Sequence, residues 1–323
     1  HGAAGREAMK VLVTGADGFV GRHLVRRLVE AGDDVAAGCR PGGPPVEWQV
    51  AAPGGPVTVV PLEITERGSV ERALEWGPAA VVHLAAIAST REARLDPAGA
   101  WVVNAAGTAQ LVDAATRRGP GPAGPLVLVV SSGEVYGAGG PSPRVETDPL
   151  LPVSPYAASK VGAEAAALEA WRRTGLRVVI ARPFPHTGPG QSTAYAVPAF
   201  AERLRAAKSS RAATVPTGNL DPVRDLLHVG DVVEAYRLLL HRGVPGEAYN
   251  VARGEGVRVG ELFRLLAGII GTGAEPRPDP SLVRSDDIPY LVGDSTKLRR
   301  ATGWAPAISV EQTLRELVDA QAD

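Results

Sequence analysis

The feature that most constrains the fold of this chain is the regular alternation of short apolar runs with helical stretches in its first half. The apolar runs predict strands at Lys10–Thr14, Asp34–Cys39, Val57–Pro61, Ala79–Leu84, Leu126–Ser131 and Leu176–Arg182. Helical patterns are found at Gly18–Ala31, Pro97–Arg118 and Pro155–Thr174. Strands that are apolar throughout and alternate with helices are typical of a parallel sheet covered on both faces. We therefore expect an α/β fold with a doubly wound parallel sheet of about seven strands.

A glycine-rich turn directly follows the first expected strand. Gly15, Gly18 and Gly21 recur every three residues between that strand and an amphipathic helix. Gly15 permits a tight turn, Gly18 lets a pyrophosphate approach the backbone, and Gly21 lets helix and strand pack closely. The helix N-terminus offers free N–H groups and a positive dipole end to phosphates. The turn predicts a Rossmann dinucleotide site, with Phe19 and Val20 at the start of its helix.

The domain organisation follows from where the alternation stops. After residue 182, short strands and helices follow one another irregularly. We expect residues 9–182 to form the dinucleotide-binding domain. Residues 183–323 are expected to be mainly a smaller C-terminal substrate-binding lobe, with some segments returning to the sheet. Residues 1–8 are expected to be a tag remnant, with Met9 as the natural start.

The end of the second strand bears on the choice of dinucleotide. An acidic residue there binds the ribose 2′-hydroxyl of NAD, whereas an Arg suits the 2′-phosphate of NADP. Here the strand Asp34–Cys39 is followed by Arg40, with no acid at its tip. This favours NADP(H), with NAD(H) as the alternative. The competing interpretation is that Arg40 is a solvated loop residue.

Tyr156 and Lys160 lie four residues apart, on one face of an expected helix. A free Tyr has a pKa of about 10, too high for acid/base chemistry at neutral pH. An ammonium one helical turn away favours the phenolate. Ser131 and Ser132 end a strand upstream, where a hydroxyl can hydrogen-bond a carbonyl that is becoming an alkoxide. We predict Tyr156 as the acid/base, with Lys160 and Ser132 as its partners; the alternative is an ordinary surface pair on a helix.

Composition narrows the possible partners and location. With 34 basic and 35 acidic residues, the net charge of −1 gives no electrostatic reason to expect nucleic acid or an anionic membrane. Cys39 is the only cysteine, and the six His show no paired metal-ligand spacing. No apolar run approaches the ~20 residues that cross a bilayer. We expect a cytoplasmic protein with no metal, no nucleic-acid partner and no membrane partner.

Four motifs together carry a resemblance to a known family: the turn TGADGFVG, His83–Ala86, Ser131–Gly137 and Tyr156–Lys160. With these motifs the chain resembles the extended short-chain dehydrogenase/reductase superfamily, which includes the NAD-dependent epimerase/dehydratase family. The resemblance covers nearly the whole chain from Met9. It implies an NAD(P)-dependent oxidoreductase that acts on a nucleotide-diphosphate sugar. It also implies a homodimer, formed through the two long helices at 97–118 and 155–174.

Three stretches of the second half resemble, more narrowly, reductases of GDP-6-deoxy-4-keto-D-mannose. They are Arg182–Gln191, Gly218–Asp225, and 284–298 with Thr302–Trp304. They imply hydride reduction of a 4-keto-6-deoxyhexose linked to GDP or dTDP, with a proton from Tyr156. Arg224 and Arg284 are candidates for bidentate bonds to the diphosphate. The alternative for each Arg is a surface ion pair.

The resemblance implies further contacts. Those to the cofactor, besides Tyr156 and Lys160, are Glu63, Ile64, Leu84, Ala85, Ala86, Asn104, Pro183 and His186. Those to the substrate are Ser89, Ser132, Glu134, Pro185, Val197, Arg224 and Arg284. Two positions depart from the usual pattern: Pro185 stands where such reductases usually carry Asn, and Glu63 where Asp is more usual.

Gly133 and Glu134 bear on the reaction. In related 4,6-dehydratases a second polar or acidic residue precedes the Glu, and these acids help to remove water from the sugar. Here Gly133 fills that position, which argues against a glucose-type dehydratase. Glu134 remains a catalytic candidate, so 4,6-dehydration stays open, as does 4-epimerisation on the same scaffold. A non-catalytic cofactor-binding regulator is a further alternative, because a fold alone does not fix function.

Overall fold

The computed structural model describes residues 8–43, 56–119, 121–283 and 287–321. Two sequence predictions fall outside these ranges: the tag remnant, apart from residue 8, and Arg284. The described chain divides into two compact units. The first is built from the described parts of 1–135, 154–182 and 233–249, and the second from those of 136–153, 183–232 and 250–323. No helix of the described chain is both long enough and apolar enough to span a membrane.

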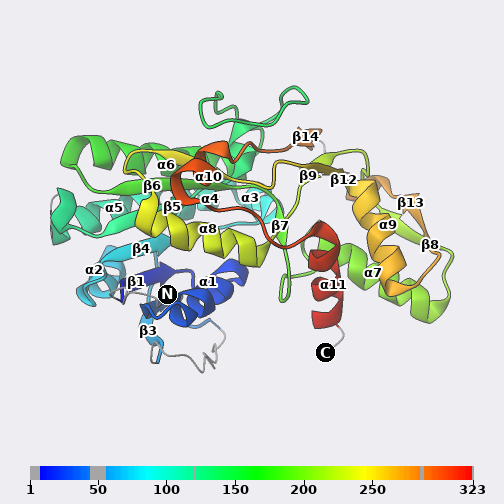
Figure 1. Ribbon diagram of the computed structural model, residues 1–323, viewed down its shortest axis with the longest axis horizontal. Helices are drawn as coiled ribbons and strands as arrows, with labels where there is room; N and C mark the ends of the chain where they lie inside the picture. The colour runs from blue at the N-terminus through cyan, green and yellow to red at the C-terminus, as the bar shows by residue number, and fades with distance from the viewer. Residues whose placement is uncertain (1–7, 44–55, 120, 284–286, 322–323) are drawn as a thin grey trace, which may run out of the picture. The chain divides into compact units, whose positions relative to one another are not determined.

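A seven-stranded sheet forms the centre of the first unit (Figure 1). Its strands are β1 (Lys10–Thr14), β2 (Asp34–Cys39), β3 (Thr58–Pro61), β4 (Ala80–His83), β5 (Leu126–Val130), β6 (Val178–Pro183) and β11 (Ala248–Val251). They are ordered β11-β6-β5-β4-β1-β2-β3, and the neighbours from β3 to β6 pair in parallel. The strand order therefore reverses at β1 and β4, which is where ligands bind in doubly wound sheets. The predicted fold class is confirmed.

Helices cover both faces of this sheet. The helices of the first unit are α1 (Phe19–Glu30), α2 (Arg67–Glu75), α3 (Thr90–Leu95), α4 (Pro97–Trp101), α5 (Gly107–Arg118) and α6 (Pro155–Thr174), together with most of α8 (Val229–Arg242). The apolar sides of α2, α5 and α6 share one core with inward side chains such as Leu12 and Val127. On the other face α1 and α8 lie side by side, joined by an ion pair of 2.8 Å between Arg27 and Glu234.

The helix α6 begins and ends where the sequence predicts. Its N-cap Ser154 accepts a hydrogen bond from the backbone N–H of Ala157, and Pro155 occupies the first turn, where its missing N–H costs nothing. Gly175 ends the helix in the left-handed conformation, with φ of 75°. These local signals fix the residue at which α6 begins, and therefore the position of Tyr156 in its first turn.

The helix expected at 97–118 is not continuous. A π-helical segment at Val102–Ala106 separates α4 from α5. Asn104 lies inside this segment and is buried. Such π-bulges often mark functional sites, because they redirect backbone and side-chain groups.

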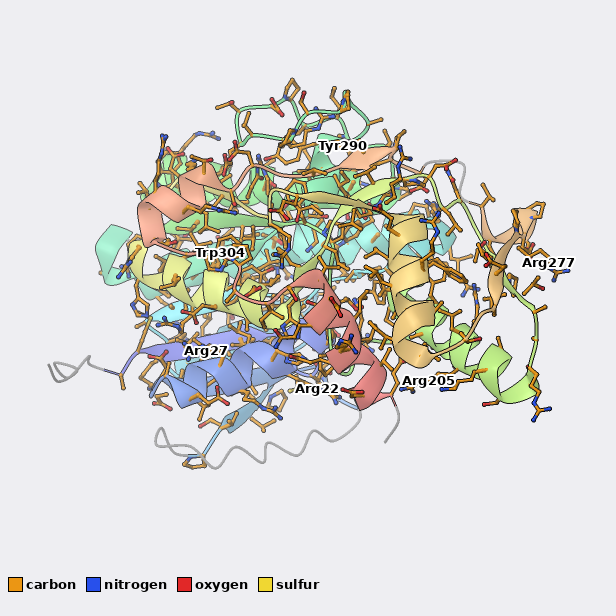
Figure 2. All side chains as sticks on the ribbon, turned by 45° about the vertical axis from the view of Figure 1, so that its right-hand side comes forward. Arg22, Arg27, Arg205, Arg277, Tyr290 and Trp304 are labelled. Atoms are coloured by element: carbon orange, nitrogen blue, oxygen red, sulfur yellow. The ribbon has the colours of Figure 1, made fainter. Side chains whose placement is uncertain are left out.

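The second unit contains short strands and further helices. The strands are β7 (His186–Thr187), β8 (Thr214–Thr217), β9 (Val223–Asp225), β10 (Leu227–His228), β12 (Gly256–Arg258), β13 (Glu275–Pro278) and β14 (Tyr290–Leu291). The helices are α7 (Ala196–Ser210), α9 (Val259–Ile270), α10 (Thr296–Thr302) and α11 (Val310–Ala320). Side chains of α7, α9 and α11 form a separate apolar core. The buried Trp304, labelled in Figure 2, donates its indole N–H to the Asp231 carbonyl and ties the segment before α11 to the start of α8.

Candidate active site

The turn between β1 and α1 requires glycine at two positions. Gly15 has φ of +65°, and a Cβ on it would lie 2.8 Å from the backbone nitrogen of Ala85. A Cβ on Gly21 would lie 2.3 Å from the Gly15 carbonyl oxygen. The turn is also held to the end of β2, where Ala16 N–H donates to the Gly38 carbonyl at 3.1 Å. The backbone therefore forms a compact cradle at a helix N-terminus, which fits a dinucleotide pyrophosphate.

A buried hydrogen-bond chain joins this turn to the π-helical segment. The Thr108 hydroxyl donates to the Asn104 carbonyl at 2.6 Å, so its lone pair accepts the Nε2–H of His83 at 3.0 Å. The Nδ1 atom of His83 then accepts from the Thr14 hydroxyl at 2.9 Å. Burial, assisted by the positive charge of Lys160, lowers the pKa of His83 to about 3. The imidazole is therefore neutral, in a single tautomer fixed by its neighbours.

Asn104 connects the same segment to α6. Its amide nitrogen donates to the Ser159 hydroxyl at 2.9 Å and to the Ile87 carbonyl at 3.0 Å, and its oxygen accepts from Ile87 N–H at 2.8 Å. Ser159 in turn donates to the backbone carbonyl of Tyr156 at 2.7 Å. This network fixes the backbone of the first turn of α6.

Tyr156 lies in that first turn and Lys160 lies in the next, and both are largely buried. Tyr156 is 9% exposed and packs with Ala93 and Ala100. Lys160 is 6% exposed, and its ammonium donates to the Val130 carbonyl at the end of β5 at 2.9 Å. The sheet edge therefore holds the cation in place beside the strand that carries the serines.

The ionisation of Lys160 is strongly perturbed. Burial lowers its pKa to about 8, and the negative charge of Glu164 opposes this fall. Glu164 also forms a buried two-armed ion pair with Arg182, at 2.9 and 2.7 Å. A buried amine with a pKa near physiological pH is typical of a group that takes part in proton transfer.

Ser131 and Ser132 follow the last residue of β5, and both side chains are buried. The Ser132 hydroxyl accepts from Glu134 N–H at 3.1 Å, which starts the 3₁₀ turn Gly133–Tyr136 and leaves its own proton available. The Ser131 hydroxyl has no hydrogen-bond partner in the described chain. Ser131, Ser132, Tyr156 and Lys160 thus all belong to the first unit.

Each of the remaining residues predicted for the first unit has a defined local contact. Leu84 and Ala85 donate their N–H groups to the Thr14 hydroxyl, at 3.2 and 3.1 Å. Glu63 accepts from both the backbone N–H and the hydroxyl of Thr65, at 3.0 and 2.8 Å. Ile64 is buried against the start of α5. Ser89 caps α3 by accepting from Glu92 N–H at 3.2 Å.

The residues predicted for the second unit lie near β7 and β9. Pro183 is buried, and the Pro185 carbonyl accepts from Leu227 N–H at 2.9 Å. His186 bonds through Nδ1 to the Phe184 carbonyl at 2.9 Å, and burial lowers its pKa. Val197 packs against the apolar core of α7, α9 and α11.

Arg224 lies on β9 and is half-buried. Its guanidinium pairs with Asp287 and donates to the Ile288 carbonyl at 2.7 Å. The next residue, Asp225, is fully buried and accepts three backbone N–H groups, from Arg253, Gly254 and Gly293, at 2.8, 2.9 and 3.3 Å. Burial raises the pKa of Asp225 to about 6.

Sequence reasoning missed the supporting residues Thr14, Thr108 and Ser159. The spacing of each to a predicted site residue becomes meaningful only once the structure is known. Thr14 directly precedes Gly15, Thr108 follows Asn104 by one helical turn, and Ser159 follows Tyr156 by three residues. Asp225 was also missed as a buried acid. No cluster of His, Cys, Asp and Glu able to hold a metal occurs among the residues that the structure describes.

A comparison with family models matches residues 11–252 to the NAD dependent epimerase/dehydratase family. The chain belongs to this family. GDP-6-deoxy-D-mannose reductase from Pseudomonas aeruginosa is 33% identical over 316 residues, which covers 96% of each chain. The solved structure of RMD from Pseudomonas aeruginosa, complexed with NADPH, matches with a TM-score of 0.83 and 33% identity, over 97% of this chain and 98% of that one.

A third relative shares the fold but is named for a different activity. The UDP-glucose 4-epimerase of Thermus thermophilus, in complex with NAD, has a TM-score of 0.84 and 31% identity, over 97% of this chain and 98% of that one. The predicted family and enzyme class are therefore confirmed: the chain is an NAD(P)-dependent enzyme of the nucleotide-sugar epimerase/dehydratase family. A nicotinamide cofactor fits the glycine cradle described above.

Proposed function

We propose that this enzyme is an NAD(P)H-dependent reductase of a 4-keto-6-deoxyhexose linked to GDP or dTDP. The observation that carries the proposal is the buried pair of Tyr156 and Lys160, with Lys160 held against the end of β5 and its pKa lowered to about 8. Similarity to a GDP-6-deoxy-D-mannose reductase over 96% of the chain supports the choice of a reductase.

In the proposed mechanism, three side chains act on the ketone oxygen. When bound, the reduced nicotinamide supplies hydride. Ser132 donates a hydrogen bond to the oxygen, which stabilises the charge that develops there. Tyr156 gives its proton to the same oxygen as general acid. The Lys160 ammonium lowers the cost of the resulting phenolate and returns a proton to it from solvent.

We further propose how the ligands are held. NADP(H) is favoured through Arg40, with NAD(H) as the alternative. The cofactor contacts are the glycine turn with Phe19 and Val20, Glu63, Ile64, Leu84, Ala85, Ala86, Asn104, Tyr156, Lys160, Pro183 and His186. The sugar nucleotide contacts are Ser89, Ser132, Glu134, Pro185, Val197, Arg224 and Arg284. Since Arg224 already pairs with Asp287, its bond to a diphosphate requires that it share or exchange this partner.

Epimerisation and dehydration use the same cofactor but return it to its starting state within each turnover. The epimerase relative from Thermus thermophilus keeps 4-epimerisation as a candidate, and Glu134 beside Ser132 keeps 4,6-dehydration as another. The consumption of cofactor separates both from a reductase. A reductase oxidises one NADPH for each sugar that it reduces, whereas the other two reactions cause no net loss.

We also propose a homodimer that forms through α4, α5 and α6. Large apolar side chains are exposed in the segment that leads into these helices: Leu95 at the end of α3 is 79%, Trp101 at the end of α4 is 47% and Val102 in the π-helical segment is 52% exposed. Exposed apolar side chains that lie together favour an interface. A cytoplasmic location is proposed because it suits a chain whose only cysteine, Cys39, is unpaired.

The proposed reaction is tested by NADPH absorbance in the presence of GDP-4-keto-6-deoxymannose, with the dTDP-4-keto-6-deoxyglucose reaction alongside. Steady and stoichiometric loss with the GDP sugar supports the reductase and its substrate. Loss with only the dTDP sugar keeps the chemistry and changes the nucleotide. No loss with either sugar contradicts the reductase proposal.

A further inference from the structure

The end of β2 has charged residues beside it that come from another segment of the chain, in addition to Arg40, which follows the strand. Arg40 follows this strand directly, but the glycine turn between β1 and α1 lies against the same strand end, through the Ala16 N–H to Gly38 carbonyl bond of 3.1 Å. The turn carries Asp17, which is half-buried. The local chain therefore places an acid beside a strand end that has no acid of its own.

Two contacts locate the Asp17 carboxylate. A Cβ built on Gly43, in the turn that follows Arg40, would lie 3.3 Å from Asp17 Oδ2. Burial, and next the negative charge of Asp17, raise the pKa of the Cys39 thiol. Both observations place the carboxylate beside the residues that end β2.

A second cation reaches the same place from α1. Arg22, labelled on α1 in Figure 2, donates its Nε–H to the Asp17 backbone carbonyl at 2.9 Å. Its positive charge acts on Cys39 in the direction opposite to that of Asp17. In the described chain, neither Arg22 nor Arg40 forms an ion pair with Asp17 within 4.0 Å. The end of β2 thus has the charges of Asp17 and Arg22 close by, and the exposed Arg40 follows it directly in the chain.

The end of the second strand is where a Rossmann protein meets the adenosine ribose, about 20 residues after the glycine turn. A carboxylate there accepts the 2′-hydroxyl of NAD and repels a 2′-phosphate, whereas guanidinium groups bind that phosphate. We propose that Asp17 sets the choice between NAD(H) and NADP(H), by opposing the attraction of Arg22 and Arg40 for the 2′-phosphate. The inference rests on the proposed use of a nicotinamide dinucleotide and adds a selectivity residue that comes from the turn instead of the strand.

The test uses the full chain and two fragments of the cofactor. Isothermal titration measures the Kd of adenosine 2′,5′-bisphosphate, which carries the 2′-phosphate, and of 5′-AMP, which does not. In Asp17→Asn, which keeps the side-chain shape, we expect the ratio of the two affinities to shift toward the bisphosphate by about tenfold, or about 1.4 kcal/mol. The shift should shrink in high salt, because exposed charges are screened.

Two further variants make the test specific. Arg40→Ala should move the ratio in the opposite direction, since it removes a phosphate ligand and keeps the carboxylate. Glu30→Gln, at the far end of α1, removes one negative charge from an exposed position and should leave the ratio unchanged.

The inference is overturned if Asp17→Asn leaves the ratio within twofold of the parent. It is also overturned if the variant weakens both nucleotides equally, since that result would assign Asp17 only to the shape of the turn. NADH and NADPH titrations of the parent protein distinguish failure of the Asp17 inference from failure of the proposed function. A parent that binds neither cofactor contradicts the proposed function as well, whereas a parent that binds either one leaves that function standing.

Discussion

Replacing Lys160 with Met measures how much the burial of its ammonium costs the folded protein. The folded protein lowers the pKa of Lys160 from 10.5 to about 8, chiefly by burial, whereas the unfolded chain restores the ordinary value. Between these two values the unfolded state binds more protons, so the Lys160 contribution to the free energy of unfolding rises with pH. Below pH 8 the full cost of burying the ammonium is present, and above pH 10.5 it is absent.

The size of the effect follows from the shift. One pKa unit corresponds to 1.36 kcal/mol, so the free energy of unfolding of the parent, relative to Lys160→Met, should rise by roughly 2–3 kcal/mol between pH 7 and pH 10. Urea denaturation of the parent and of Lys160→Met at pH 7, 8.5 and 10 measures this difference. Contributions from groups that titrate alike in the two proteins cancel in it. A flat difference for Lys160→Met would refute the claim that its ammonium is desolvated in the fold.

Two further substitutions test the cradle and its supports, and a third tests the buried acid of the second unit. Gly21→Ala places a methyl group 2.3 Å from the Gly15 carbonyl, so we expect at least a tenfold rise in the Kd for NADPH by fluorescence titration; an unchanged Kd would show that the turn does not need glycine there. His83→Leu removes both bonds to Thr14 and Thr108 and should lower the free energy of unfolding by roughly 2–4 kcal/mol in urea, and a loss below about 1 kcal/mol would contradict the buried chain. Asp225→Ala strands three backbone N–H groups and should cost about 3 kcal/mol or more in the same assay, with little change if solvent reaches them.

The sequence predicts best those elements whose signals are local. The bounds of β1, β2 and α6 match the structure, because a continuous apolar run, or a cap at each end, defines each of them. The strand β11 was not identified, since its four residues complete the sheet only by pairing with a strand some 70 positions earlier in the chain. The break between α4 and α5 was missed because Asn104 is held there by Ile87 and Ser159, which are distant in sequence.

The same distinction applies to the site. Tyr156 and Lys160 are found from sequence because helical spacing alone puts them on one face. The bonds between Thr14, His83 and Thr108 join residues that are 69 and 25 positions apart, so no local pattern reports them. Asp17 shows the same limit in the cofactor site: the absence of an acid after β2 predicted NADP(H), but the fold brings an acid to that strand end from another segment.

The role of Tyr156 is tested most directly by Tyr156→Phe, assayed by NADPH absorbance with the 4-keto sugar nucleotide that the parent reduces. Loss of a general acid typically costs 10²–10⁴-fold, so we expect kcat to fall by about that factor. The Kd for NADPH should stay within about threefold of the parent, since the hydroxyl is only one of many cofactor contacts. A variant that oxidises NADPH as fast as the parent would contradict proton donation by Tyr156, and with it the proposed mechanism.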